Sequence, residues 1–479
     1  MTGTIRRVGW LVAYLAATGA ANAASVPLID AIRTADQAAI RGLLQKRVDV
    51  NAAEPDGGTA LHWAARTSDV QTAELLLRAG ANVKAANRYG VTPLSLACTT
   101  GNAAMINLLL KAGADPNSAL PEGETALMTA ARSGSAEGVK TLLARGADVN
   151  KKEAWRGQTA LMWAAAEGHV DVIRILLANG ADMHVRSNGG FTPLLFAVRE
   201  GKLGAVKTLL DAGADLNESL ASRRKSASEE PGVSAFMLAV ANVHYELAAY
   251  LLDKGADANS APDGFTALHQ ITWRRRPGTG DNNPAPQGSG SLDSLAFVRT
   301  LVKHGANVNA RATRQVNMGV TIRFHTIGAT PFLLAARTAD LPLMRLLLEL
   351  GADPLLANED GTTPLMAAAG VGTNSPLEEP GTEAEVLEAV KLVAGLGADL
   401  NTVDKNGDTA MHGAAHKHVP SVIRFLSEKG AAVQVWNQPN NAKQTPLQIA
   451  EGVLVGMNIV THAPTAAAIR EVVAASKAN

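Results

Sequence analysis

Residues 190–213 read GFTPLLFAVREGKLGAVKTLLDAG, and this stretch contains the signals for two short helices joined by a turn. Thr192 can cap a helix through its hydroxyl, and Pro193 suits the first helical turn, where a backbone donor has no partner in any case. Apolar residues recur at helical spacing across residues 205–210. Gly213 lies where a helix commonly ends in a left-handed residue. The stretch therefore predicts one helix–turn–helix unit followed by a loop.

The loop glycine recurs along the chain, each time after Leu-Leu and two further residues, with small variations. These glycines occupy positions 80, 113, 146, 180, 213, 255, 305, 351, 397 and 430, and the first four intervals are 33, 33, 34 and 33 residues. A period this regular indicates that one supersecondary unit is stacked many times, so that each unit contacts only its neighbours. Such a stack has an extended surface rather than a closed pocket, which favours binding over catalysis.

The first helix of each helix–turn–helix unit begins with the same short sequence pattern. The copies of this pattern begin at Thr59, Thr92, Thr125, Thr159, Thr192, Thr266, Thr330, Thr363, Thr409 and Thr445, each followed by Ala or Pro and then by Leu, Phe or Met, with Ser234 opening a degenerate copy. This series resembles ankyrin repeats over nearly the whole chain after residue 25. The resemblance implies an all-α ankyrin-repeat solenoid of about ten to twelve units, in which helix-turn-helix pairs stack and β-turn or hairpin fingers project.

The ends of the array depart from the repeat pattern. Residues 24–52 form a first unit with Arg47 where the family usually has glycine, and we interpret this unit as an N-terminal capping repeat. Repeats follow over 53–443. Residues 444–479 open like a repeat but then differ, which predicts C-terminal capping helices.

The second half of the array contains insertions, near 218–232, 274–292, 311–328 and 370–383. Insertions in a repeat array map to loops. Two of them, 274–292 and 370–383, fall between the two helices of their units. We expect both loops to emerge from the same edge of the stack. The 311–328 insertion alternates apolar and other residues around Asn317 and Gly319, which predicts a strand or hairpin in a lengthened finger.

The N-terminus predicts export. Arg6 and Arg7 precede a short apolar run over 8–17, and Ala21-Asn22-Ala23 offers a cleavage site of the A-x-A type. Residues 1–23 therefore read as a secretory signal peptide; an uncleaved anchor and a twin-arginine signal are the alternatives. A bacterial periplasmic or secreted protein is expected, without stable membrane insertion after cleavage.

Charge and cysteine content narrow the possibilities further. The chain has 44 basic and 44 acidic residues, so no overall field favours nucleic acid. Its one cysteine, Cys98, falls at a helix-packing position and is expected to be buried. Catalytic signatures are absent: we find no His-Glu-x-x-His, Cys-x-x-Cys, Gly-x-Ser-x-Gly or Walker-type sequence. The expectation is a protein that is not an enzyme, without catalytic residues or cofactors.

Histidines provide the nearest approach to a metal site. His412, His416 and His418 lie close together, but His412 occupies the position where the family places a structural histidine, as do His62 and His269. We therefore expect hydrogen bonds between repeats at these three positions and no metal site.

By resemblance to ankyrin proteins, partners contact the residues that follow the Ala-Ala of each first helix and the finger tips. We predict the following protein-binding residues: Arg33, Arg66, Arg132, Arg199 and Arg337 on the helix face; Arg88, Tyr89, Trp155, Arg156, Phe191 and Phe265 at finger tips; and Arg274, Arg275 and Arg276 in an insertion. Arginine and large aromatic residues dominate interface energetics, although arginine can also simply solvate such positions. Trp63 and Trp163 directly follow helix openings and were interpreted as core residues.

These features predict an exported, monomeric ankyrin-repeat scaffold that binds another protein, with an acidic segment, through a concave surface and loop tips. Three alternatives remain open. The protein could be a periplasmic accessory that protects or assembles an enzyme, or a secreted effector directed at a host. In a different class, it could bind a small molecule or act as an enzyme through its insertion loops, which would require a closed cavity with convergent polar groups.

Overall fold

The structure is a computed structural model that describes residues 26–220, 232–277, 287–315, 324–373, 380–455 and 458–478. The predicted signal peptide therefore lies outside the described residues, as do the predicted hairpin over most of the 311–328 insertion and the central parts of the other three insertions. The chain divides into two compact units, Met1–Ala221 (unit 1) and Ser222–Asn479 (unit 2).

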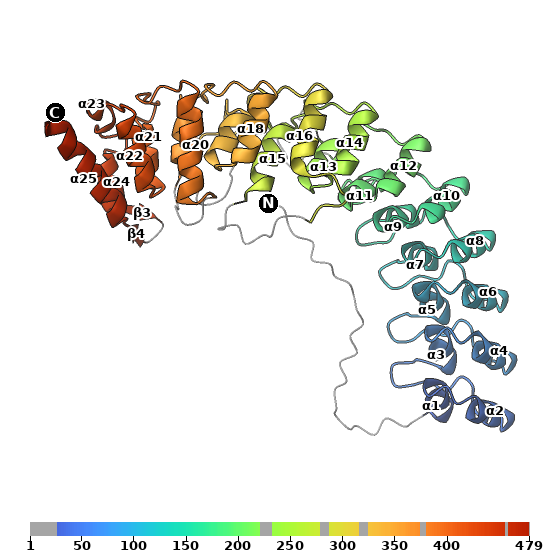
Figure 1. The fold of residues 1–479 in the computed structure, drawn as a ribbon. Helices are drawn as coiled ribbons and strands as arrows, with labels where there is room; N and C mark the ends of the chain where they lie inside the picture. Colours follow the sequence, from blue (N-terminus) through green and yellow to red (C-terminus); the bar gives the residue numbers. More distant parts are fainter. Residues whose placement is uncertain are drawn as a thin grey trace. The chain divides into compact units, whose positions relative to one another are not determined.

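Unit 1 consists of helix pairs. Its helices are α1 (Pro27–Arg33), α2 (Gln37–Gln45), α3 (Ala60–Arg66), α4 (Val70–Arg78), α5 (Pro93–Thr100), α6 (Ala103–Lys111), α7 (Ala126–Arg132), α8 (Ala136–Ala144), α9 (Ala160–Glu167), α10 (Val170–Ala178), α11 (Pro193–Arg199) and α12 (Leu203–Asp211), followed by the short strand β1 (Ser219–Leu220). The odd-numbered first helices pack on one another as one row, and the even-numbered second helices form a second row beside it (Figure 1).

Unit 2 repeats this plan with longer connections. After β2 (Val233–Ser234) come α13 (Ala235–Ala241), α14 (Tyr245–Asp253), α15 (Ala267–Arg275), α16 (Ser294–Lys303), α17 (Pro331–Arg337), α18 (Leu341–Glu349), α19 (Pro364–Ala369), α20 (Glu383–Gly395), α21 (Ala410–His416), α22 (Pro420–Glu428), α23 (Val433–Trp436), α24 (Pro446–Glu451), the hairpin β3 (Val453–Val455) and β4 (Asn458–Val460), and α25 (Ala463–Ala478). The first helices α13, α15, α17, α19, α21 and α24 again pack in sequence.

The local signals of the repeat act as the sequence predicts. The hydroxyl of Thr192 accepts a hydrogen bond from the Leu195 amide at 3.2 Å and so caps the start of α11. Pro193 lies in the first turn of this helix. Gly213 adopts a φ of 100°, which L side chains rarely tolerate. In the N-terminal repeat, Arg47 occupies the position of this glycine. Its φ is 55°, so it adopts the left-handed conformation at some conformational cost. An all-α ankyrin-repeat solenoid is confirmed.

The core is distributed along the stack and is built largely from small side chains. Ala64 and Ala65 of α3, and Ala130 and Ala131 of α7, are fully buried, which lets neighbouring helices approach closely. Cys98 is also fully buried, as predicted, and burial raises the pKa of its thiol. The expected stack of small-residue helices is therefore the source of stability in both units.

At the C-terminal end, α25 packs against both α22 and α24. Two ion pairs support this contact: Arg424 Nε lies 3.3 Å from Glu471, and Arg470 pairs with Glu451. Within the described part of the chain, none of the helices has the length and apolar character that a membrane crossing requires.

Candidate functional site

Four first helices of unit 1 end in arginine: Arg33 ends α1, Arg66 ends α3, Arg132 ends α7 and Arg199 ends α11. A cation is favourable there because the last carbonyl groups of a helix carry partial negative charge. Since the first helices stack in one row, the ends of these four helices lie along the same edge of unit 1 (Figure 1).

Trp63 of α3 is held between two of these arginines and a glutamate. The guanidinium carbons of Arg33 and Arg66 lie over the indole, 4.1 and 5.1 Å from its centroid. The indole Nε1 donates a hydrogen bond to Glu54 at 2.7 Å, and the other carboxylate oxygen of Glu54 pairs with Arg33 at 2.5 Å. Cation–π attraction and a charge-assisted hydrogen bond thus fix the indole on the surface.

The same arrangement recurs at Trp163 of α9. The Arg132 guanidinium lies 4.5 Å from the Trp163 ring centroid and 3.1 Å from the Glu124 carboxylate. Glu124 also accepts a hydrogen bond from the Thr129 hydroxyl at 2.8 Å. Here the indole Nε1 is buried without a hydrogen-bond partner, so the ring is held by packing and by the cation rather than by the glutamate.

Arg199, the last of the four arginines, lies over two phenyl rings. Its guanidinium carbon lies 5.0 Å from the ring centroid of Phe191 and 4.9 Å from that of Phe196, and the two rings are 5.2 Å apart. The Glu200 carboxylate accepts from Arg199 Nε at 2.8 Å. We call the set Arg33, Trp63, Arg66, Arg132, Trp163 and Arg199 the arginine–aromatic face.

The interpretation of Trp63 and Trp163 as core residues is wrong, because both are only half-buried. The fourth residue of a first helix lies beside the terminal arginine of the preceding first helix, so one side of each indole packs inward while the other meets a guanidinium. These two tryptophans belong to the candidate surface, and the sequence interpretation missed them.

Two finger tips of unit 1 present exposed aromatic rings. Tyr89 is 55% exposed and Trp155 is 72% exposed, and each carries an arginine neighbour. The guanidinium of Arg88 lies 4.7 Å from the Tyr89 ring centroid, and that of Arg156 lies 4.5 Å from the Trp155 centroid. Of the six predicted finger-tip residues, the four on these two tips are therefore exposed, whereas Phe191 is half-buried against Arg199.

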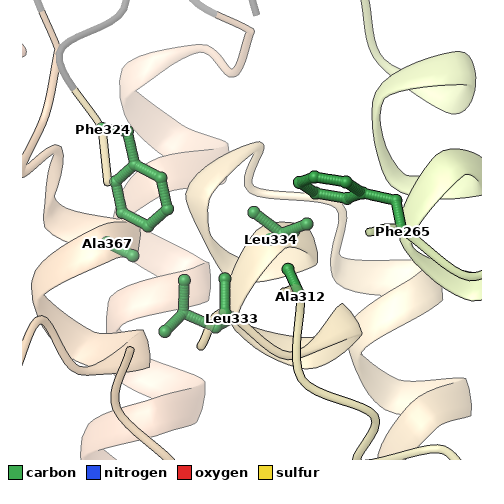
Figure 2. Packing of buried hydrophobic residues seen from close by; sticks show 7 residues of the cluster. Phe265, Ala312, Phe324, Leu333, Leu334 and Ala367 are labelled. Carbon is green, nitrogen blue, oxygen red and sulfur yellow. The ribbon is translucent and has the colours of Figure 1, made fainter. Parts of the chain in front are cut away.

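Two predicted surface residues of unit 2 are buried. Phe265 is 1% exposed and packs beside Leu334 in a cluster that also contains Ala312 and Phe324 (Figure 2). Arg337 is 4% exposed, and its guanidinium carbon lies 5.5 Å from the Phe324 ring centroid. Because Phe265 packs in this cluster and Phe324 lies against Arg337, neither predicted residue is exposed to a partner, and the surface prediction is wrong for both.

The arginines predicted at the start of the 274–292 insertion also differ from expectation. Arg274 and Arg275 form the last turn of α15 rather than a loop. Arg275 makes a two-pronged ion pair with Asp340, through Nε at 2.7 Å and Nη2 at 3.1 Å. Arg276 pairs with Glu385 and lowers the pKa of that carboxyl to about 2. Arg275 and Arg276 join repeats within unit 2, and they are not available as a free basic loop.

Glu54 contacts two residues of the candidate face, and sequence reasoning did not find it. The first residue of a finger generally accepts hydrogen bonds from the turn that follows: Asn87 accepts from the Tyr89 and Val91 amides, both at 3.0 Å, and Glu153 accepts from three amides. Glu54 occupies the same position but directs its carboxylate to Trp63 and Arg33. The sequence did contain a signal for this contact: a glutamate at the first position of the finger, followed by a tryptophan in the next helix.

The three structural histidines behave as predicted. In each, Nδ1 accepts from the backbone amide of the helix-capping threonine, at 3.1 Å for His62 and 3.2 Å for His269 and His412. The opposite nitrogen, Nε2, lies 3.0 to 3.1 Å from a carbonyl oxygen of the next repeat. Burial lowers the pKa of all three, to about 4 for His269. Within the described ranges, no group of three or more potential ligands could hold a metal ion.

Comparison with known proteins gives the class of the chain. The family model described as "Ankyrin repeats (3 copies)" matches residues 28–120, 87–153 and 127–219, and the model described as "Ankyrin repeat" matches residues 327–359. Together with the stacked helix pairs, these matches show that the chain is an ankyrin-repeat protein. Ankyrin repeats are protein-interaction modules, typically without catalytic activity, so the chain carries the architecture of a protein–protein interaction scaffold.

Three relatives are similar over part of the chain. "Ankyrin repeat and SOCS box protein 6" of Homo sapiens is 30% identical over 198 residues, which are 40% of this chain and 38% of the relative. The Pongo abelii protein of the same name is 29% identical with the same coverage. "Putative ankyrin repeat protein" of Rickettsia bellii is 32% identical over 131 residues, 26% of this chain and 62% of that protein. The chain thus spans less than two thirds of each relative.

Proposed function

We propose that this protein is an exported scaffold that binds an acidic segment of another protein on the arginine–aromatic face of unit 1. In ankyrin proteins, by resemblance, the ends of the first helices line the concave side of the stack. The proposal assigns the contact to Arg33, Trp63, Arg66, Arg132, Trp163 and Arg199, while Arg337 of unit 2 is excluded by its burial.

The observation that carries the proposal is the environment of Trp63. The ring is half-buried and is held by Arg33, Arg66 and Glu54 in a fixed orientation. Tryptophan and arginine are the residues most enriched in binding hot spots. Since these side chains are already ordered, a partner would lose little of its binding free energy to immobilising them.

Charge supports an acidic partner at one position in particular. Arg33, Arg132 and Arg199 each have a carboxylate neighbour, whereas no carboxylate lies within ion-pair distance of Arg66 among the described residues. The face thus holds four guanidinium groups beside four carboxylates, Asp30, Glu54, Glu124 and Glu200, and Arg66 is the one arginine of the four that no carboxylate of the described residues pairs with. A partner carboxylate would form an ion pair with Arg66. Packing of the partner on the Trp63 and Trp163 rings would supply the remaining affinity.

A capture experiment tests the face. The full chain and a variant with Arg66→Glu, Arg132→Glu and Arg199→Glu would be immobilised, and proteins retained from a periplasmic extract would be identified by mass spectrometry. The matched control carries Arg41→Glu, Arg78→Glu and Arg174→Glu, which make the same charge change on exposed residues of the second helices. A partner retained by parent and control but lost from the first variant supports the proposal. Equal retention by all three proteins contradicts it.

Export is a separate part of the proposal and has its own test. The supporting observation is the sequence of residues 1–23, with its paired arginines, apolar run and small-residue cleavage site. The expected outcome in a bacterial host is a product that begins at Ala24 and is released by osmotic shock. N-terminal sequencing of a full-length product that remains with the cytoplasm would contradict export while leaving the binding face untouched.

A further inference from the structure

The finger tips of unit 1 carry charges of alternating sign. Four consecutive fingers present Asp56, then Arg88 with Tyr89, then Glu122, then Trp155 with Arg156. We call these six residues the fingertip row. The basic tips carry the two exposed aromatic rings, whereas the acidic tips follow a proline and carry no ring.

The spacing along the row is fixed by contacts between fingers. Arg88 N donates to the Asp56 carbonyl at 2.8 Å, and Ala154 N donates to the Glu122 carbonyl at 2.9 Å. Pro121 has no N–H and interrupts this ladder, but there Gly90 packs so closely that an added Cβ would lie 2.9 Å from Pro121 Cδ. The fingers therefore stack as a rigid series.

The Trp155 tip is especially well ordered for such an exposed side chain. The buried Glu153 carboxylate accepts hydrogen bonds from the amides of Trp155 and Arg156, both at 2.7 Å, and from Gln158 at 2.9 Å. Asn188 of the next finger donates its side-chain amide to the Trp155 carbonyl at 3.0 Å. Backbone on both sides of the indole is thus held in place while the ring itself is exposed.

Each basic tip offers a flat ring and a cation together. Arg88 and Arg156 lie over the adjacent rings, and no carboxylate of the described residues is within ion-pair distance of either guanidinium. A guanidinium that is not paired can bind a carboxylate through two parallel hydrogen bonds. The exposed ring beside it offers contact to a flat apolar group, such as proline or another aromatic residue. Glu122, between the two basic tips, would repel an acidic residue and attract a basic one.

The distance between tips selects the conformation of a ligand. Helices pack about 8–10 Å apart, so neighbouring fingers lie about 10 Å apart. A polyproline II helix has three residues per turn and rises about 3.1 Å per residue, so one turn covers about 9 Å and every third residue points the same way. In a β-strand, residues three apart point to opposite faces, so that only every second finger would be contacted. Polyproline II is therefore the conformation that places one side chain on each finger.

We propose that the fingertip row binds a proline-rich segment of the partner protein in the polyproline II conformation, with one turn on each finger. The segment carries an acidic residue opposite Arg88, a basic residue about three positions away opposite Glu122, and a second acidic residue about three positions further opposite Arg156. Prolines between them pack on Tyr89 and Trp155. This inference rests on the proposed scaffold function and specifies a second contact region beside the arginine–aromatic face.

The test uses two synthetic proline-rich peptides of equal length and the full chain. The in-register peptide carries Glu, Lys and Glu at every third position, and the inverted peptide carries Lys, Glu and Lys. Binding of fluorescently labelled peptide is measured by anisotropy at low ionic strength. We expect the in-register peptide to bind at least about tenfold more tightly, the equivalent of about 1.4 kcal/mol.

Charge exchange on the protein makes the test specific. The double variant Arg88→Glu and Arg156→Glu is expected to prefer the inverted peptide, and Glu122→Lys to lose the preference for a basic residue at the centre. Trp155→Ala and Tyr89→Ala should weaken both peptides without altering the preference. The control variant Arg41→Glu, Arg78→Glu and Arg174→Glu, which changes exposed residues of the second helices, should bind the in-register peptide as the parent does.

Three outcomes would overturn the inference. They are absence of binding by the in-register peptide, equal binding of both peptides, and an unchanged preference in the charge-exchanged variant while its thermal unfolding matches that of the parent. If peptide binding is unaffected by fingertip variants while partner capture is lost on substitution of the arginine–aromatic face, the inference fails and the proposed function stands. The reverse result would sustain the fingertip site and remove the other.

Discussion

Arginine at the end of a first helix has different surroundings in the two units. In unit 1, Arg66 is exposed and lies over Trp63, without an ion pair among the described residues. In unit 2, Arg337 occupies the same place in the repeat but is buried, and Phe324 from the lengthened finger lies against it. The comparison shows that repeat position alone does not determine whether a residue is available for binding. What decides it is whether the connecting segments of the neighbouring repeats are long enough to cover the position.

Two ion pairs, one from each unit, differ strongly in burial. Arg275 in unit 2 is bound to Asp340, whose side chain is 1% exposed, whereas the pair between Arg174 and Asp171 in unit 1 has both side chains more than half exposed. Removing one partner of a buried pair leaves an uncompensated charge, while an exposed pair is screened by water. Arg275 therefore stabilises the fold of unit 2, whereas exposed pairs, among them Arg299 with Glu349 in the same unit, contribute little.

The largest effect is expected for Asp340→Ala. This change removes the partner of Arg275 and also the cap of α18, where Asp340 accepts from the Leu343 amide at 3.2 Å. We expect a loss of about 3–5 kcal/mol in the free energy of unfolding, measured by urea denaturation. The matched substitution Asp171→Ala in unit 1 should cost less than about 0.5 kcal/mol. Similar losses in the two variants would contradict the division between the units.

Acid should destabilise unit 2 first. Burial lowers the pKa of His269 in the folded protein from the ordinary value of about 6.5 to about 4, and burial together with the neighbouring His462 lowers the pKa of His418 to about 4. Between these values the unfolded chain binds protons that the folded chain does not, so stability is lost as the pH falls from about 6.5 towards 4. The fully buried His269 accounts for about 3 kcal/mol over that range, and the partly exposed His418 for less, because water screens its charge. Burial raises the pKa of Asp404 and Asp408, which partly offsets the loss.

The measurement is urea denaturation at pH 7 and pH 5, followed by hydrogen exchange to assign the unit that opens. His418→Asn should reduce the pH dependence of stability, because asparagine does not titrate. Asparagine is chosen because it tolerates the left-handed backbone at this position, where φ is 61°. Equal stability at both pH values, or earlier opening of unit 1, would refute this prediction.

Trp63→Ala is expected to have an intermediate effect. The change removes a half-buried ring together with its contacts to Arg33, Arg66 and Glu54, so we expect a loss of about 1–2 kcal/mol, less than for a fully buried tryptophan. Trp63→Phe keeps a ring but loses the hydrogen bond to Glu54, and should cost about 1 kcal/mol. Thermal unfolding of both variants separates the two contributions; a larger loss for phenylalanine than for alanine would contradict this account.

The smallest effect on stability is expected at Arg66. Arg66→Ala removes one exposed guanidinium and should change the free energy of unfolding by no more than about 0.5 kcal/mol, while partner capture decreases. Arg337→Ala in unit 2 is the comparison, because its burial predicts a clear loss of stability and no direct loss of a partner contact. A stability loss at Arg66 as large as that at Arg337 would show that the exposed arginine has a structural role as well.

The sequence predicts the repeat architecture well because its signals are local. The capping threonines, the proline in the first turn and the left-handed glycine act within a few residues of one another, as at Thr192, Pro193 and Gly213. The three structural histidines were also predictable, since their partners lie at a fixed place in the next repeat. Regular stacking converts a local pattern into a reliable contact.

The surface was less predictable because it depends on contacts between segments far apart in sequence. Phe265 is buried in a cluster with Leu334 and lies 5.2 Å from the Trp273 ring, contacts that no repeat position indicates. Glu54 contacts Arg33 across 21 positions, and this pairing determines that Trp63 lies at the surface. Predicting these residues would have required the register of side chains between repeats, whereas the sequence pattern alone specifies the backbone.

An added Cβ at Gly90 would lie 2.9 Å from Pro121 Cδ, so these two fingers are in close contact, and the fingers are spaced one to each repeat. The recognition length of the row can therefore increase or decrease only by one complete repeat. Duplication or deletion of a repeat would move one charged tip by a whole step and would select a ligand whose matching residue is displaced by about three positions. Unequal recombination between repeats is thus a direct route from one ligand sequence to another, with no intermediate that binds both equally well.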